Sequence, residues 1–244
     1  MAILSKQRRP LLPRPVVGVS SCLLGQAVRY DGNDKRQPLL LRCLQPHVDW
    51  LPFCPEVAAN LGIPRPPVHL VQDSPDEVRA VGVYDHSVDV TDVLTLTSNA
   101  HVEQLHSQPG LCGYIVKAHS PSCGLGSAAL SDRDGSSLGA TNGLFAAALQ
   151  HHIADLVLVD EMALATEEAC WRFLSACYLL FYRRFHYVPY PQLSHLLRQL
   201  QLEKQQIVEL EVATKGTDKK AAPSTRLEQL FEFWRAVTPD DEIS

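Results

Sequence analysis

Three cysteines could do chemistry together, because each lies in a short motif of small and polar residues. Cys22 follows two serines, Cys54 precedes Pro-Glu-Val, and Cys123 lies in Ser-Pro-Ser-Cys-Gly. Each motif follows an apolar run that reads as a buried strand, and α/β proteins build their sites in loops at strand ends. Thiolates are soft ligands that select iron–sulfur clusters, zinc or copper(I). The three cysteines are therefore candidate ligands of one metal centre, with a coordination position left for a substrate.

The spacing of the cysteines does not identify the metal. Structural zinc sites usually contain close Cys-x-x-Cys pairs, and this chain has none. The total of seven cysteines is odd, and no export signal precedes them. A disulfide framework is therefore disfavoured relative to reduced thiols or metal ligands. Cys43, Cys170 and Cys177 fall on predicted helices, where we expect them to pack in the core as small apolar residues.

The elements that must position these motifs alternate between strands and helices. Short apolar runs predict strands, and amphipathic or capped segments predict helices between them. Such alternation indicates an α/β fold with a parallel, Rossmann-like sheet and helices on both faces. The expected strands cover residues 16–20, 49–53, 79–83, 113–117 and 155–159, and the expected helices cover 37–47, 56–61, about 91–105 and 144–152.

The chain from Glu167 onward is predicted to be helical. Apolar residues recur there at intervals of three and four, which gives one apolar helix face. Prolines end this helix, a second helix is expected over 193–210, a polar segment over 214–224 and a short helix over 227–237. We therefore divide the chain into an α/β domain of residues 1–160 and a helical C-terminal extension of residues 161–244.

Composition restricts the class of protein. The net charge of −5 argues against a broadly basic surface of the kind that coats nucleic acid. No apolar run is long enough to span a bilayer, and the basic segment 1–15 is not followed by a secretory apolar stretch. A cytoplasmic protein without a membrane partner is expected, and the oligomeric state is left open.

Several motifs, taken in order, closely resemble the thiouracil desulfidase (TudS) family. The resemblance runs from about Val16 to Val159. It implies that Cys22, Cys54 and Cys123 hold a 4Fe–4S cluster whose fourth iron has no protein ligand. It also implies removal of sulfur from 4-thiouracil or a 4-thiouridine derivative, giving the uracil compound and hydrogen sulfide. The segments that carry it are SSCLLG with VRYDG, CPEV with GIPRPP, and SPSCG.

The implied reaction needs an acid/base group beside the cluster. An open iron would act as a thiophilic Lewis acid that polarises the C=S bond, and water would replace sulfur without net redox change. Glu56, two residues after Cys54, is the first candidate for the general acid/base. Taken alone, it also reads as a first-turn helix residue favoured by the helix dipole. Ser120 is a candidate for orienting the water or donating to the leaving group, or else an ordinary loop hydroxyl.

Four charged residues are candidates for substrate binding. Arg29 and Asp31 follow the first cysteine loop, although Asp31-Gly32 is also a turn signal. Arg65 lies in a proline-rich loop, where its guanidinium could meet a carboxylate, a base edge or a phosphate. Lys117 ends a predicted strand and either neutralises charge near the cluster or a phosphate, or is an exposed strand end.

The expected partner is a small thiolated pyrimidine. Thiolated tRNA, a second substrate class that the resemblance allows, has no electrostatic support, because residues 183–244 carry nine Lys and Arg against nine Asp and Glu. Two alternatives to an enzyme remain: an iron–sulfur redox or metal sensor without turnover, and a zinc-binding structural module. The flanking Glu56 and Ser120 favour the enzyme, because a sensor does not need them.

Overall fold

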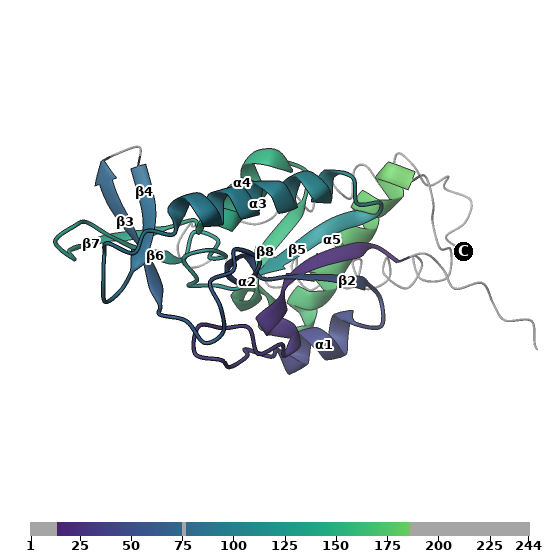
Figure 1. Ribbon diagram of the computed structural model, residues 1–244. Coiled ribbons are helices and arrows are strands. Elements are labelled where there is room, and N and C mark those ends of the chain that lie inside the picture. Colours follow the sequence, from purple (N-terminus) through teal and green to yellow (C-terminus); the bar gives the residue numbers. More distant parts are fainter. Residues whose placement is uncertain (1–13, 75–76, 186–244) are drawn as a thin grey trace, which may run out of the picture. The chain divides into compact units, whose positions relative to one another are not determined.

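The main sheet is parallel and carries the strands that lead into the cysteine motifs. The computed structural model describes residues 14–74 and 77–185, so the elements expected between residues 189 and 237 lie outside the described residues. Within them, four strands pair in the order β2-β1-β5-β8, and all neighbours are parallel (Figure 1). Their bounds are Val16–Ser20 for β1, Asp49–Phe53 for β2, Leu111–Val116 for β5 and Val157–Asp160 for β8.

Helices cover both faces of this sheet, as the alternating pattern predicted (Figure 1). α1 (Pro38–Leu44) and α5 (Glu167–Phe185) bury apolar side chains with β1 and β5 on one face. α3 (Thr91–His106) and α4 (Leu144–His152) build a separate apolar cluster on the other face. The predicted α/β class is therefore confirmed, and β1, β2 and α4 have the bounds expected from the sequence.

α5 packs closely against the main sheet. A Cβ atom at Gly113 of β5 would lie 2.5 Å from Cys177 Sγ and 2.7 Å from the Phe173 ring, so only glycine fits beneath this helix. Cys170 and Leu174 of α5 are fully buried in the same cluster. Cys170 and Cys177 thus pack in the core. The proposed division of the chain at residues 160 and 161 stays a prediction, but α5 itself is part of the core around the sheet.

A second, smaller sheet was not expected from the sequence. It has the order β4-β3-β6-β7, with antiparallel hairpins β3–β4 and β6–β7 joined by a parallel β3–β6 pair. Its strands are Val68–Ser74, Glu77–Gly82, Ala128–Ser131 and Ser137–Thr141 for β3, β4, β6 and β7. The last two are short and largely polar, so they lack the apolar run that identified the main strands. In the turn that connects them, the backbone N–H groups of Asp134 and Ser136 donate to Asp132 Oδ1.

Short helical turns begin where strands of the main sheet end. β1 leads into η1 (Ser21–Leu24), β2 into α2 (Pro55–Ala58) and β8 into η2 (Glu161–Leu164). Because the strands are parallel, these turns gather at one edge of the sheet. In the part of the chain that the structure describes, no helix combines the length and apolar character needed to cross a membrane.

Candidate active site at the carboxyl edge of the sheet

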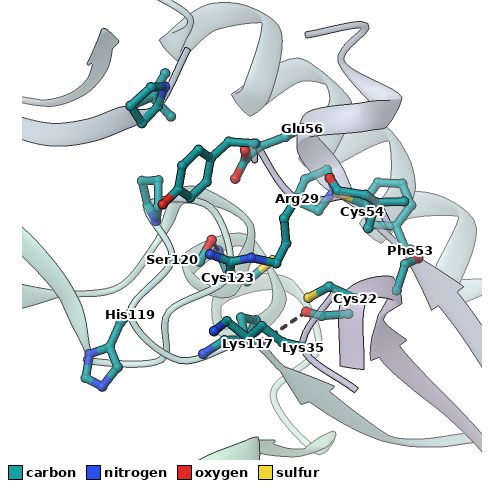
Figure 2. A pocket seen from close by; sticks show the side chains of 18 of the residues that line it. Cys22, Arg29, Lys35, Phe53, Cys54, Glu56, Lys117, His119, Ser120 and Cys123 are labelled. Atoms are coloured by element: carbon teal, nitrogen blue, oxygen red, sulfur yellow. Dashed lines mark hydrogen bonds between the residues drawn. The ribbon is translucent and has the colours of Figure 1, made fainter. Parts of the chain in front are cut away.

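A pocket of about 420 Å³ lies at the carboxyl ends of β1, β2 and β5. Cys22, Cys54 and Cys123 all line it, together with Glu56 and Ser120 (Figure 2). The three cysteines come from loops after three neighbouring strands, and so residues that are far apart in the sequence meet here. The structure thus brings together the cysteines and the two residues that the sequence proposed for acid/base chemistry.

Local backbone structure presents each cysteine to the pocket. Cys22 lies in η1, which ends at Gly25 in the left-handed conformation. Cys54 is the N-cap residue of α2, and its Sγ lies 3.9 Å from the Val28 carbonyl oxygen. Cys123 lies in a turn closed by a hydrogen bond of 2.8 Å from Gly124 N to the Ser120 carbonyl oxygen. In each motif, a short helix or turn therefore presents the thiol to the pocket.

Cys22 and Cys123 are buried and Cys54 is half-buried, and burial disfavours the charged forms of their thiols. Burial, with a smaller contribution from Cys54, raises the pKa of Cys22 to about 11. Burial also raises the pKa of Cys54 and of Cys123. A bound metal centre would offset this effect, because its positive charge stabilises the deprotonated form of its cysteine ligands.

The donor set fits a polynuclear centre better than a single ion. Among the described residues, no three His, Cys, Asp or Glu side chains are grouped closely enough to hold one metal ion. In an iron–sulfur cluster each cysteine binds its own iron, so the sulfur ligands stand farther apart than around one ion. Three thiols that line one pocket could each bind a different iron of such a cluster.

Glu56 is held in place by an arginine clamp. Arg65 donates to Glu56 Oε2 from Nε at 2.8 Å and from Nη2 at 2.7 Å, while Ser122 Oγ donates to Oε1 at 3.0 Å. Arg65 Nη1 donates to the carbonyl oxygens of Val28 and Gly62 at 3.0 and 2.8 Å. Of the three partners considered for Arg65, the structure shows the carboxylate. Four of its five N–H donors meet protein acceptors, so the structure shows Arg65 as the clamp of Glu56 on the wall of the pocket.

Ser120 both shapes the loop and faces the pocket. Its Oγ accepts hydrogen bonds from the backbone N–H groups of Ser122 at 3.2 Å and Cys123 at 3.1 Å. These bonds fix the turn that carries Cys123, which is the loop role considered from the sequence. The hydroxyl proton is not used in either bond, and Ser120 lines the pocket, so a donor remains available there.

Lys117 lines the pocket and is not an exposed strand end. Its Nζ pairs with Glu161 and donates to the Ala118 carbonyl oxygen at 2.8 Å. Glu161 is buried, and its Oε2 accepts a hydrogen bond of 2.6 Å from the Ala118 N–H. Sequence reasoning did not identify Glu161. Its position directly after the last strand of the main sheet was the available signal.

Arg29 and Asp31 differ in their position relative to the pocket. Arg29 lines the pocket, its guanidinium lies 5.2 Å from the Tyr30 ring centroid, and its Nε lies 3.4 Å from Asp31 Oδ1. That buried Nε makes no hydrogen bond with the described residues. Asp31 is not among the lining residues, and its Oδ1 accepts from Asn33 N at 3.1 Å, as in an Asx turn. The structure thus places Asp31 in a turn beside Arg29, not at the pocket wall.

His119 and Lys35 also line the pocket and were missed from the sequence. His119 has a φ of 58°, which is uncommon for a residue other than glycine. Ser127 holds it there: Ser127 Oγ accepts from His119 N at 3.0 Å, and the Ser127 carbonyl oxygen lies 3.1 Å from Nδ1. In Figure 2 the His119 ring points away from the three cysteines. Its position directly before Ser120 was the signal that could have identified it.

Comparisons with known proteins agree with this site. The family model described as 2-thiouracil desulfurase matches residues 17–161, which include all three cysteines, Glu56 and Ser120. No curated protein matches the chain. A solved structure of a [4Fe-4S]-dependent thiouracil desulfidase, TudS, is similar, with 30% sequence identity and a TM-score of 0.48. The match covers 62% of this chain and 93% of that one. On the extent of the family match, this chain belongs to the 2-thiouracil desulfurase family.

Proposed function

We propose that this protein is an iron–sulfur enzyme that hydrolyses the C=S bond of 4-thiouracil or a 4-thiouridine derivative. The products would be the uracil compound and hydrogen sulfide. The observation that carries the proposal is one pocket lined by three cysteines and by a carboxylate held at both oxygens. Membership of a desulfurase family supports the removal of sulfur, and the name of the similar TudS structure supports the choice of a [4Fe-4S] cluster.

Cys22, Cys54 and Cys123 would hold the cluster. When bound through three cysteines, a 4Fe–4S cluster supplies one iron without a protein ligand, a thiophilic Lewis acid for the thiocarbonyl sulfur. The chain's own part is to bring three largely buried thiols to one pocket. Burial strengthens electrostatic interactions within the pocket and excludes competing water.

Glu56 would move the protons of the reaction. Water adds its oxygen to the ring carbon, the C–S bond breaks, and the two hydrogens of water leave with sulfur as hydrogen sulfide. Glu56 would accept a proton from the attacking water and return it to the departing sulfur. Arg65 makes both of its contacts with Glu56 at Oε2, and among the described residues Ser122 is the hydrogen-bond partner of Oε1. Oε1 thus has a further lone pair for a water molecule.

Other residues would orient the substrate. Ser120 offers a hydroxyl proton that the loop does not use, and it could donate to the attacking water or the leaving group. Arg29 offers a buried Nε–H without a hydrogen-bond partner in the described residues, which suits a carbonyl oxygen of the pyrimidine. Lys117 contributes a positive charge to the pocket wall next to Ser120, and its ion pair with Glu161 balances that charge.

The proposal is tested with anaerobically reconstituted protein and a panel of thiolated substrates. Iron, acid-labile sulfide and visible absorption are measured first, and then sulfide release from 4-thiouracil, 2-thiouracil, 4-thiouridine monophosphate and thiolated tRNA. We expect a cluster and turnover of at least one 4-thio compound. A cluster without turnover on any substrate would favour the sensor, and zinc alone would favour the structural module.

A matched pair of variants checks the ligand assignment. Cys22→Ser removes a thiol that lines the pocket, whereas Cys170→Ser removes a buried thiol of α5 that does not line it. We expect the first variant to lose the cluster and the second to keep it. Equal loss of iron in both variants would contradict the assignment.

A further inference from the structure

Tyr114 has a buried hydroxyl without a hydrogen-bond partner. The side chain lies on β5 and is fully buried, and its Oη makes no hydrogen bond with any described residue. Buried tyrosine hydroxyls usually find a partner, because leaving one unpaired costs free energy. Phenylalanine would fill the same space without that cost. The hydroxyl therefore indicates a partner outside the described residues.

The position of the ring points to that partner. The Tyr114 ring packs against Gly18 of β1. A Cβ atom at Gly18 would lie 2.1 Å from the ring, so only glycine leaves room for it. The ring meets Phe145 of α4 edge to face at 5.4 Å. Cys123 belongs to the same apolar cluster, and Phe53, the neighbour of Cys54, packs against it. Tyr114 does not line the pocket, so its hydroxyl lies behind the pocket wall rather than among the substrate contacts.

Electrostatics agree with this placement. Burial is the main cause that raises the pKa of Tyr114, and the Cys123 and Cys54 thiolates raise it further. The hydroxyl therefore remains protonated, as a hydrogen-bond donor requires. Neither sulfur is within hydrogen-bond distance of it in the protein alone. A larger sulfur-containing group held by these cysteines would bring an acceptor closer.

We propose that the Tyr114 hydroxyl donates a hydrogen bond to a sulfur atom of the iron–sulfur centre held by Cys22, Cys54 and Cys123. The inference rests on the proposed function, because it needs the cluster. Hydrogen bonds to the sulfurs of such clusters stabilise the more reduced state and raise the reduction potential. Tyr114 would thus tune and position the cluster. It is not a catalytic residue, since it does not reach the pocket.

Two tyrosine-to-phenylalanine variants test this inference, because each removes one buried hydroxyl and nothing else. Tyr114→Phe removes the unpaired hydroxyl, whereas Tyr178→Phe removes a hydroxyl that donates to the His47 carbonyl oxygen at 3.0 Å. The cluster's reduction potential is measured by voltammetry. The deuterium sensitivity of its Fe–S vibrations is measured by resonance Raman spectroscopy. The urea midpoint of the cluster-free protein is measured as well.

We expect Tyr114→Phe to shift the potential to a more negative value and to remove part of the deuterium sensitivity. In the cluster-free protein the same variant should raise the urea midpoint, because an unpaired buried hydroxyl is gone. Tyr178→Phe should leave the potential and the vibrations unchanged and lower the midpoint, because it breaks a formed hydrogen bond.

An unchanged potential and unchanged vibrations in Tyr114→Phe would overturn the inference and indicate that a buried water molecule satisfies the hydroxyl. A lowered midpoint of cluster-free Tyr114→Phe would overturn it too, because the hydroxyl would then have a partner within the protein. These readouts need a cluster but no turnover. A wild-type cluster without desulfidase activity would therefore contradict the proposed function alone, and failure of the wild type to bind a cluster would contradict both.

Discussion

At the scale of single residues, the arginine clamp on Glu56 distinguishes catalytic from positioning roles. The Glu56 side chain is 13% exposed, and that of Arg65 is 4% exposed. The Arg65 guanidinium is thus nearly removed from solvent, whereas the Glu56 carboxylate keeps access to the pocket. An acid/base group needs such access, whereas its clamp does not.

Glu56→Gln keeps the shape of the side chain and removes its ability to take up a proton. We expect kcat to fall about 100- to 10,000-fold, the range typical of a lost general acid/base. Iron content and visible absorption should match those of the wild type, because Glu56 is not a proposed ligand. Activity close to that of the wild type would remove Glu56 from the mechanism.

Arg65→Lys separates a positioning role from a substrate-binding role. Lysine keeps the positive charge but cannot reproduce the planar, multi-point contact with Glu56 and two carbonyl oxygens. We expect kcat to fall by about tenfold or more, with little change in KM. A raised KM with an unchanged kcat would instead show that Arg65 binds the substrate, as the sequence first suggested.

At the scale of elements, α3 packs on β2 through a half-buried histidine. The rings of His101 and Phe53 stack with centroids 3.6 Å apart and planes 8° apart, and Phe53 lines the pocket. Burial lowers the pKa of His101 to about 4, and the Gln104 side chain offsets this only in part. The folded protein therefore prefers a neutral imidazole at the back of the pocket.

This preference predicts acid sensitivity of the cluster-free protein. The pKa of His101 is lower in the folded state than its ordinary value of 6.5, so its contribution to stability is complete above pH 6.5. It is lost as the pH falls towards 4. By pH 5 the loss should be about 1 kcal/mol after allowance for partial solvent exposure.

Urea unfolding at pH 7.5 and pH 5.0 measures this loss. The cluster-free wild type should lose more stability between the two pH values than His101→Phe, which has no titrating group at this position. His151→Phe, which replaces an exposed histidine at the end of α4, is the matched control and should behave like the wild type. Equal losses in wild type and His101→Phe would contradict the role given to His101.

At the scale of the whole molecule, the core depends on α5. Fully or almost fully buried side chains of this helix cover the face of the sheet that also holds α1. The family match ends at residue 161, before α5 begins. The stretch that matches the family and the physical unit of folding therefore need not have the same C-terminal boundary.

Truncation tests where that unit ends. A chain of residues 1–164 would expose the apolar face of β1, β5 and α1, whereas a chain of residues 1–185 keeps every described element. We expect only the longer chain to be soluble and to unfold cooperatively, monitored by far-UV circular dichroism. Cooperative unfolding of residues 1–164 would instead support an α/β domain that ends near residue 160.

The sequence by itself determined the parts of the site that local patterns encode. Apolar runs located the strands of the main sheet, and the small residues beside Cys22 and Cys123 located two of the turns that follow them. The parallel α/β class follows from the alternation of strands and helices, because parallel strands need crossover connections. The convergence of the cysteines could be predicted, since neighbouring parallel strands end at one edge.

Only the tertiary structure decided which charged side chains meet. Ser122 and Glu56 are separated by 66 positions, and Lys117 and Glu161 by 44, yet each pair is in contact. No periodicity or turn signal reports such distances, because they depend on how loops from different strands pack. The same packing left Asp31 outside the pocket wall. It also engaged Arg65 with a carboxylate and buried the hydroxyl of Tyr114 behind the cysteines.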